Sequence, residues 1–296
     1  MSRSFYGGVP GGRRELLPGA APERRYPSRE KNRKTAAFGL LAAFVTGLSL
    51  VLYPSLSNYI NVLHQTREIA AYAQEVEGLD AAVCGELRQK AEIYNASLSS
   101  RDNPYQLTEE QEVAYPGLLD ISRSGAMGYI EIPSLEVMLP IYHGTSDAVL
   151  QRAVGHLAWT SLPVGGESTH SVLSGHRGLP SSRLFTDLDK LSAGDIFLLR
   201  VLDETLTYEV DQILIVEPQD VSALQIAEGK DYCTLITCTP YGINTHRLLI
   251  RGHRIENRTE AGNIRLIAEA VQIEPLVIAP LLSIPLLLLL VLLTLF

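Results

Sequence analysis

Between residues 127 and 254 the sequence is a succession of short runs with the character of β-strands. Within each run, apolar side chains alternate with polar ones or cluster together, and proline and glycine residues lie between the runs. The runs cover residues 128–132, 137–141, 171–174, 196–201, 205–217, 232–237 and 247–254. Many short strands at this spacing predict a mainly β fold, a closed or nearly closed β-barrel. Residues 182–191 and 221–224 are expected to form short helical connections.

Both ends of the chain carry an uncharged apolar run. The first, residues 36–53, is just long enough to cross a membrane as a helix, and Pro54 marks its expected end. We therefore predict a transmembrane helix at residues 36–57. A cleaved signal peptide is the alternative, although the sequence has no convincing small-residue cleavage site.

The residues before the first run are basic. Residues 1–34 contain seven arginines and two lysines against three glutamates, whereas the whole chain has a formal net charge of −8. This asymmetry indicates a cytoplasmic flank at a membrane and argues against a nucleic-acid partner. Residues 1–35 are rich in Gly, Pro and Arg and lack apolar periodicity, so they are predicted to be a disordered cytoplasmic tail.

The second apolar run covers residues 276–296 and contains Pro280 and Pro285. If it also spans the membrane, both termini are cytoplasmic and the domain between the spans is extracytoplasmic. A buried core helix is the alternative, and no lysine or arginine follows the run to support the orientation. Residues 257–275 have apolar side chains at helical spacing and are predicted to form a juxtamembrane helix.

Two further segments separate the first run from the predicted barrel. Residues 58–98 have apolar side chains at helical spacing, which predicts one or two helices outside the membrane. Residues 99–118 form a predicted loop that contains the sequence Asp102-Asn103-Pro104-Tyr105.

The chain has three cysteines, Cys84, Cys233 and Cys238. An odd, sparse count argues against a disulfide framework and leaves room for a reactive thiol. Cys84 is expected to be a packed side chain. Cys233 precedes Cys238 by five residues in the same predicted strand, so the two side chains should point to opposite faces.

Cys238 ends one predicted strand and Arg247 begins the next. Antiparallel pairing of these strands would place a thiol beside a fixed positive charge, which can favour a thiolate or hold an oxyanion. His176, in a glycine-flanked turn after another strand, is the best candidate for the proton-transfer partner. Structural roles are expected for the other candidate histidines, which are His143, His156, His170, His246 and His253.

These residues resemble a known family. Thr234-Leu-Ile-Thr-Cys238, with Arg247 downstream and His176 upstream, is similar to the pattern of the sortases, a family of cysteine transpeptidases. Further segments resemble the class C, pilus-assembling sortases: Met127-Gly-Tyr-Ile-Glu-Ile-Pro, Leu139-Pro-Ile-Tyr-His-Gly, Gly155-His-Leu, Thr160-Ser-Leu-Pro-Val-Gly-Gly-Glu, Leu184-Phe-Thr-Asp-Leu-Asp-Lys and Tyr208-Glu-Val-Asp-Gln-Ile. The resemblance implies an eight-stranded sortase-type barrel at residues 126–256.

The resemblance also implies the reaction and the partners. The substrate would be a Leu-Pro-x-Thr-Gly-like (LPXTG-like) sorting signal, cut between Thr and Gly through a thioester on Cys238. The acceptor would be a lysine amine of a pilin subunit, and no cofactor is expected. A cell-wall-anchoring sortase and a hydrolytic cysteine protease share the first half of this chemistry and are alternatives to this function. A non-enzymatic, membrane-tethered β-domain is a further alternative. Metal binding has little support, since Cys and His show no paired ligand spacing.

Class C sortases often carry a lid before the barrel, in which an Asp-Pro-aromatic motif covers the catalytic cleft. By this resemblance residues 99–118 would form a lid with Asp102, Pro104 and Tyr105 as its contact residues, although Asn103 interrupts the order. In such a lid the carboxylate meets the site arginine and the ring lies over the sulfur. An ordinary surface loop is the alternative. Thr237 is expected either to brace the site or to contact substrate.

Overall fold

The computed structural model describes residues 7, 29–98, 101, 103–121 and 125–257. Within them, eight strands form a closed barrel in the order β1-β2-β3-β4-β7-β8-β6-β5. The strands are β1 (Ala126–Ile132), β2 (Val137–His143), β3 (Val154–His156), β4 (Thr169–Ser174), β5 (Ile196–Val201), β6 (Glu204–Val216), β7 (Asp231–Thr239) and β8 (His246–Ile255). The predicted closed β-barrel is confirmed.

The one strand that the sequence did not reveal is β3. It has three residues, pairs in parallel with β2 and antiparallel with β4, and all three residues are buried. A strand this short has no alternation to detect. It nevertheless closes the barrel between β2 and β4, the strand that leads to His176.

The barrel interior is filled by apolar side chains from all parts of the sheet. Phe197 and Tyr208 stack at its centre, with ring centroids 5.5 Å apart. Gly252 faces these rings, and a Cβ atom added there would lie 2.7 Å from the Phe197 ring. A glycine is therefore required at this position, because the two rings occupy the space of a side chain.

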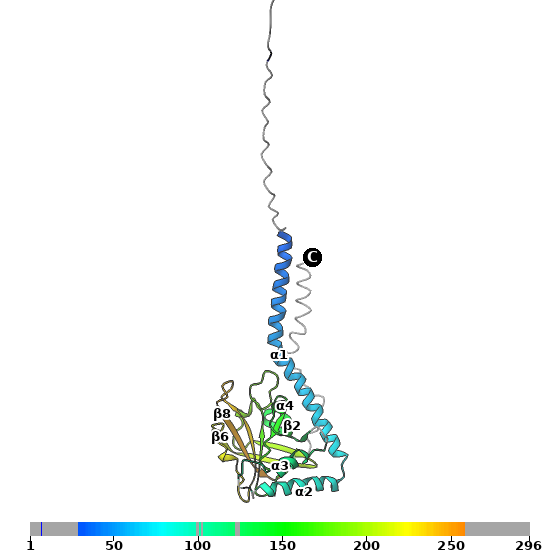
Figure 1. Cartoon of the computed structure of the whole chain (residues 1–296), viewed down its shortest axis with the longest axis vertical. Coiled ribbons are helices and arrows are strands. Elements are labelled where there is room, and N and C mark those ends of the chain that lie inside the picture. Colours follow the sequence, from blue (N-terminus) through cyan, green and yellow to red (C-terminus); the bar gives the residue numbers. More distant parts are fainter. Residues whose placement is uncertain (1–6, 8–28, 99–100, 102, 122–124, 258–296) are drawn as a thin grey trace, which may run out of the picture.

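The long first helix, α1 (Arg29–Glu77), differs from its prediction at both ends. It begins inside the segment predicted to be disordered, and Pro54 lies within the helix instead of ending it. Proline removes one helical hydrogen bond, which bends a helix that is otherwise stabilised on both sides. Figure 1 shows α1 bending part-way along, between the part that projects from the barrel and the part that runs beside it.

The remaining helices are short or lie against the barrel. In Figure 1, α2 (Ala81–Leu98) crosses the end of the barrel far from the projecting part of α1. The segment at 99–118 is not one loop, because α3 (Glu109–Ala114), capped by Thr108, and the 3₁₀-helix η1 (Tyr115–Gly117) occupy its second half. The other short elements are η2 (Pro133–Leu135), α4 (Asp147–Leu150), η3 (Leu188–Lys190) and η4 (Ser222–Leu224).

Within the described residues, one helix is long and apolar enough to cross a membrane. Its candidate part, Thr35–Glu77, contains a window with a mean hydropathy of 2.1, none of which is buried against the protein. The predicted second span at 276–296 and nearly all of the predicted helix at 257–275 lie outside the described residues, as does most of the basic tail.

Candidate active site

Cys238 and Arg247 lie directly opposite each other on neighbouring strands. In the antiparallel pair β7–β8, Cys238 is in register with Arg247. Residues that pair directly in this way project from the same face of the sheet, with Cβ atoms about 5 Å apart. The Arg247 guanidinium also donates to the carbonyl oxygens of Asn244 (3.4 Å) and His246 (3.2 Å), which ties it to the loop between the strands.

His176 follows the strand on the other side of Cys238. β4 pairs with β7 in parallel, and the last pair in register is Ser174 with Ile236. The amide of Gly175 continues the ladder by donating to the carbonyl of Ile236 at 3.0 Å. His176 and Cys238 each lie two residues beyond that last pair. The structure therefore brings the three predicted residues to one end of three adjacent strands.

Thr237 fastens the chain just before His176 to the strand that carries Cys238. Its hydroxyl donates to the carbonyl oxygen of Gly175 at 2.8 Å, and the side chain is buried. This geometry fits bracing, the first of the two expected roles, because a buried hydroxyl already bound to the backbone presents little surface to a ligand.

The sequence did not single out Arg177, which the structure places at the site. Its side chain is 8% exposed, forms an ion pair with Asp189 and donates to the hydroxyl of Thr239 at 3.2 Å. The guanidinium also lies 5.9 Å from the ring centroid of Tyr241. Its partners are 12 and 62 residues away along the chain, so no local pattern could reveal them.

An apolar cluster lies on the face of the sheet that carries Cys238 and Arg247. We call it the outer apolar face; its buried members are Val172, Leu224, Ile236 and Leu249, with Leu157, Trp159, Leu214, Val216, Val221 and Ala223 packed at its margin. Strand alternation places Ile236 on the same side as Cys238 and Leu249 on the same side as Arg247. The four central members are buried, so beside the reacting residues only the half-buried margin of this face is open to solvent.

The other two cysteines are buried away from this face. Cys84 lies on α2 and is 2% exposed, and Cys233 points into the barrel and is 0% exposed. Burial raises the pKa of the Cys233 thiol well above its usual value, which makes a thiolate there unfavourable. Cys238 is partly exposed.

The other candidate histidines are engaged elsewhere. Each ring nitrogen of His143, His156 and His170 lies within hydrogen-bonding distance of an oxygen atom. Burial lowers the pKa of His156 to about 4, so this side chain is neutral at physiological pH. His246 is exposed and contacts its neighbour Thr245, and His253 pairs with Tyr232 near the opposite end of β7.

Of the three residues predicted as lid contacts, the structure describes Pro104 and Tyr105. Tyr105 packs edge-on against Trp159, with ring centroids 5.5 Å apart, and its hydroxyl accepts a hydrogen bond from the Gln225 side chain. Pro104 is exposed in the same turn, and Asp102 lies outside the described residues. Arg101 holds this turn by donating to the carbonyls of Pro104 (2.9 Å) and Trp159 (2.8 Å).

This arrangement places the Tyr105 ring near the far end of β4. The carbonyl oxygen of Gln225 lies 2.9 Å from Nδ1 of His170, six residues before His176. Six extended residues span roughly 20 Å. Tyr105 therefore packs at the margin of the outer apolar face, where it lines a pocket of about 390 Å³. Its predicted lid contact with the sulfur of Cys238 stays a prediction.

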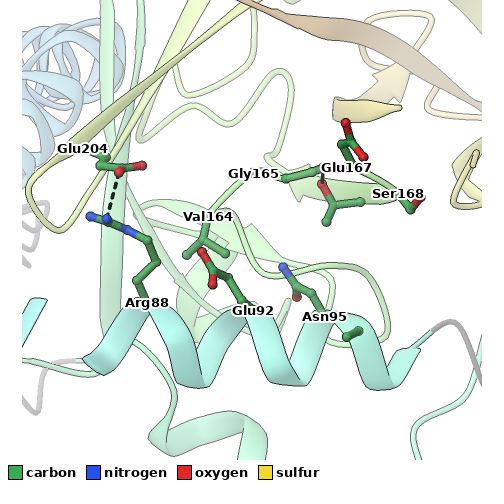
Figure 2. Close-up of a pocket in the computed structure, with 11 residues that line it drawn as sticks. Arg88, Glu92, Asn95, Val164, Gly165, Glu167, Ser168 and Glu204 are labelled. Atoms are coloured by element: carbon green, nitrogen blue, oxygen red, sulfur yellow. Dashed lines mark hydrogen bonds and ion pairs between the residues drawn. The ribbon is translucent and has the colours of Figure 1, made fainter. Parts of the chain in front are cut away.

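A second pocket, of about 460 Å³, lies between α2 and the loop before β4. Figure 2 shows Arg88, Glu92 and Asn95 on α2 facing residues 164–168, with Arg88 paired to Glu204. Asn95 exchanges two hydrogen bonds with the backbone of Leu162, so the pocket belongs to the junction of α2 with the barrel. It lies near the start of β4, away from His176.

Known proteins share this fold and this part of the sequence. A family model described as a sortase domain matches residues 130–255. The structure of sortase C1 from Streptococcus agalactiae is 52% identical, covers 65% of this chain and 100% of its own, and superposes with a TM-score of 0.63. A sortase C from Streptococcus pneumoniae is 44% identical, with 64% and 97% coverage and a TM-score of 0.59.

The chain belongs to the sortase family, whose members are cysteine transpeptidases. Its close structural neighbours are class C sortases, which confirms that part of the resemblance. Among relatives of other classes, Bacillus subtilis sortase D is 33% identical over 133 residues. The matches span 64% of that relative and 44% of a Streptomyces coelicolor sortase.

Proposed function

We propose that this protein is a membrane-anchored transpeptidase that cleaves an LPXTG-like sorting signal between Thr and Gly. It holds the acyl fragment as a thioester on Cys238 and transfers it to a lysine amine of a pilin subunit. The observation that carries the proposal is the pairing of Cys238 with Arg247, with His176 at the same end of the parallel neighbour β4.

The first half of the reaction uses all three side chains. The thiolate of Cys238 attacks the carbonyl carbon of the substrate threonine, and the negative charge that develops on the oxygen is stabilised by Arg247. The carbon–nitrogen bond breaks as His176 gives a proton to the departing glycine amine. The products are a thioester on Cys238 and the released C-terminal fragment.

The second half reverses the proton transfer. A lysine amine attacks the thioester carbonyl and loses a proton to His176, and the carbon–sulfur bond breaks to restore Cys238. The new bond is an isopeptide bond, so repetition joins subunits into a covalent polymer. Arg247 serves the second oxyanion as it served the first.

The outer apolar face supports the substrate class. A peptide whose reacting carbonyl is at Cys238 could place its Leu and Pro side chains against the half-buried margin of this face, which includes Leu214 and Val216, and water would be excluded from them. A structure of Clostridium perfringens sortase C, 44% identical with a TM-score of 0.57, is described as containing the C-terminal cell wall sorting motif. A signal of that kind is the substrate we propose for this chain.

The test is a two-substrate assay with the full chain in detergent micelles or nanodiscs. The protein is mixed with a Leu-Pro-x-Thr-Gly peptide and an excess of a lysine-bearing pilin peptide, and adducts and products are weighed by mass spectrometry. We expect an acyl adduct on Cys238 that passes to the lysine amine, and neither species with Cys238→Ala. An adduct that only hydrolyses would favour a protease, and transfer only to a cell-wall peptide amine would favour cell-wall anchoring.

We also propose that α1 anchors the barrel outside the cytoplasm and that residues 276–296 form a second span, with both termini inside. The uncharged, unburied window of α1 supports the first span, and the sequence alone supports the second. Cysteine-accessibility labelling of intact cells would test the topology. A cysteine introduced after residue 296 should react with a permeant reagent and not with an impermeant one.

A further inference from the structure

The part of α1 beside the barrel is hydrogen-bonded to the chain that follows His176. Asn58 Oδ1 accepts a hydrogen bond from the backbone amide of Arg183 at 2.9 Å. One turn later, Asn61 Nδ2 donates to the carbonyl oxygen of Ser181 at 2.7 Å. Spacings of three and four residues place Asn58, Asn61 and Gln65 on one face of the helix.

Gln65 completes this polar face in a buried position. Its side-chain amide donates to the carbonyl of Arg152 at 2.7 Å and lies 3.4 Å from the hydroxyl of Ser182. The side chains of Gln65 and Ser182 are both buried. Hydrogen bonds between buried groups fix relative position strongly, because any displacement leaves a buried donor or acceptor unpaired.

Residues 176–187, which we call the histidine segment, are cross-braced so that this hold reaches His176. The amide of Phe185 donates to the carbonyl of His176 at 3.1 Å, and the amide of Gly178 donates to the hydroxyl of Thr186 at 3.2 Å. The Phe185 ring presses on Gly175, where an added Cβ would lie 2.6 Å from the ring. The tip of the segment and the histidine therefore move together.

Close apolar packing does not fill this junction. A pocket of about 320 Å³ lies between α1 and the barrel, lined among others by Asn58, Gln65, Leu139, Ser182 and Leu184. Apolar contact around such a space constrains the segment weakly. Leu184 and Phe185 anchor the segment in the barrel core, and the directional hydrogen bonds from α1 fix its position on the other side.

We propose that Asn58, Asn61 and Gln65 are positioning residues for transpeptidation. They hold the tip of the histidine segment against α1 and thereby set His176 beside Cys238. The candidate membrane helix is then part of the scaffold of the active site as well as an anchor. The proposal rests on the proposed role of His176.

The opposite hydrogen-bonding roles of the two asparagines give a matched pair of variants. Asn58 accepts, so Asn58→Asp keeps the contact, whereas Asn61 donates, so Asn61→Asp loses it and sets a carboxylate against a carbonyl. Both variants add one negative charge to the same helix face, one turn apart. In the full chain we expect Asn58→Asp to retain kcat within about twofold and Asn61→Asp to lose about tenfold in kcat, with KM nearly unchanged.

Two further variants and a stability measurement complete the test. Asn61→Gln retains an amide donor and should restore part of the rate. Thr66→Ala removes a hydroxyl that donates to the Val62 carbonyl within α1 and should behave as wild type. Rates are expressed per folded molecule, measured by thermal unfolding. The pH profile of kcat/KM should change in Asn61→Asp and not in Asn58→Asp, which a loss of general stability would not produce.

Equal activities and equal pH profiles of the two aspartate variants would overturn the positioning role. His176→Ala separates this failure from that of the proposed function. If His176→Ala is inactive while Asn61→Asp matches Asn58→Asp, positioning alone is wrong. If His176→Ala transfers the acyl group at the wild-type rate, the assignment of His176 is wrong and the positioning proposal falls with it.

Discussion

Arg177 donates a hydrogen bond to the hydroxyl of Thr239 at 3.2 Å, and this contact joins the two segments that carry the proposed reacting residues. Arg177 is the neighbour of His176, and Thr239 is the neighbour of Cys238. Asp189 fixes the guanidinium from a third segment. The segments that carry the histidine and the cysteine are thus joined by a side chain other than the three proposed reacting ones.

Replacing Arg177 with methionine should slow the reaction without weakening substrate binding. The change leaves Asp189 and Thr239 without their partner, and we expect kcat to fall about tenfold while KM stays within about twofold. Arg251→Met is the control, since it breaks the Arg251–Asp211 ion pair on the same barrel. The measurement is the steady-state kcat and KM of both variants. Equal losses of kcat in the two variants would mean that Arg177 contributes only to stability.

Thiol labelling should separate the three cysteines. We expect iodoacetamide to modify the native chain at Cys238 alone, because Cys84 and Cys233 are 2% and 0% exposed. Burial also raises the pKa of the Cys233 thiol, which removes the reactive thiolate. Peptide mapping after labelling, with and without denaturant, gives the measurement. Native labelling of Cys233 would contradict the described packing of β7.

Stability should fall as the pH drops from about 6.5 to about 4. Burial lowers the pKa of His156 to about 4, so in this range the unfolded chain binds a proton there that the folded chain does not, and protonation favours unfolding. The contribution lost is roughly 3 kcal/mol. Denaturant unfolding of wild type and His156→Gln across this range should show a shallower pH dependence in the variant, and parallel curves would refute the assignment.

Removing the Tyr105 ring should affect peptide binding more than the reactivity of the thiol. The ring packs on Trp159 at the margin of the outer apolar face and is hydrogen-bonded to Gln225, which contacts His170, six residues before His176. We expect Tyr105→Ala to lower KM for the sorting peptide about threefold, because the peptide no longer has to displace the Tyr105–Trp159 ring pair. The alkylation rate of Cys238 should stay unchanged. Tyr105→Phe keeps the ring and should resemble wild type. Faster alkylation of Tyr105→Ala would instead support a lid over the sulfur.

Local patterns in the sequence predict seven of the eight strands. The features that they do not predict are the short strand β3 and the side-chain contacts between distant parts of the chain. Alternation located the longer strands to within a few residues, but β3 is too short to alternate. The proximity of Cys238 and Arg247 followed from one hairpin. Contacts made by long-range closure of the fold, such as Arg177 with Thr239 and Asn61 with Ser181, leave no local pattern, because the partners are 62 and 120 residues apart.

The helix α1 was predicted less well for a related reason. A proline lacks the amide donor that continues a helix and so commonly marks a helix end, but α1 continues through Pro54 to Glu77. Tyr105 was expected over the sulfur by analogy with an ordered lid motif, and Asn103 interrupts that motif in this chain. The structure places the ring where Gln225 and Trp159 can hold it.

Under the proposed membrane anchoring, the continuity of α1 sets the distance between the bilayer and the proposed catalytic residues. The contacts to the histidine segment at Asn58 and Asn61 follow the end of the apolar run, near Tyr53, by only five to eight residues, which is about 8–12 Å of helix. With α1 in the bilayer, the catalytic edge of the barrel lies within a thin layer above the lipid headgroups. In the proposed reaction, a substrate tethered to the same membrane would be concentrated in that layer, whereas a soluble peptide would reach it only by diffusion from bulk solution.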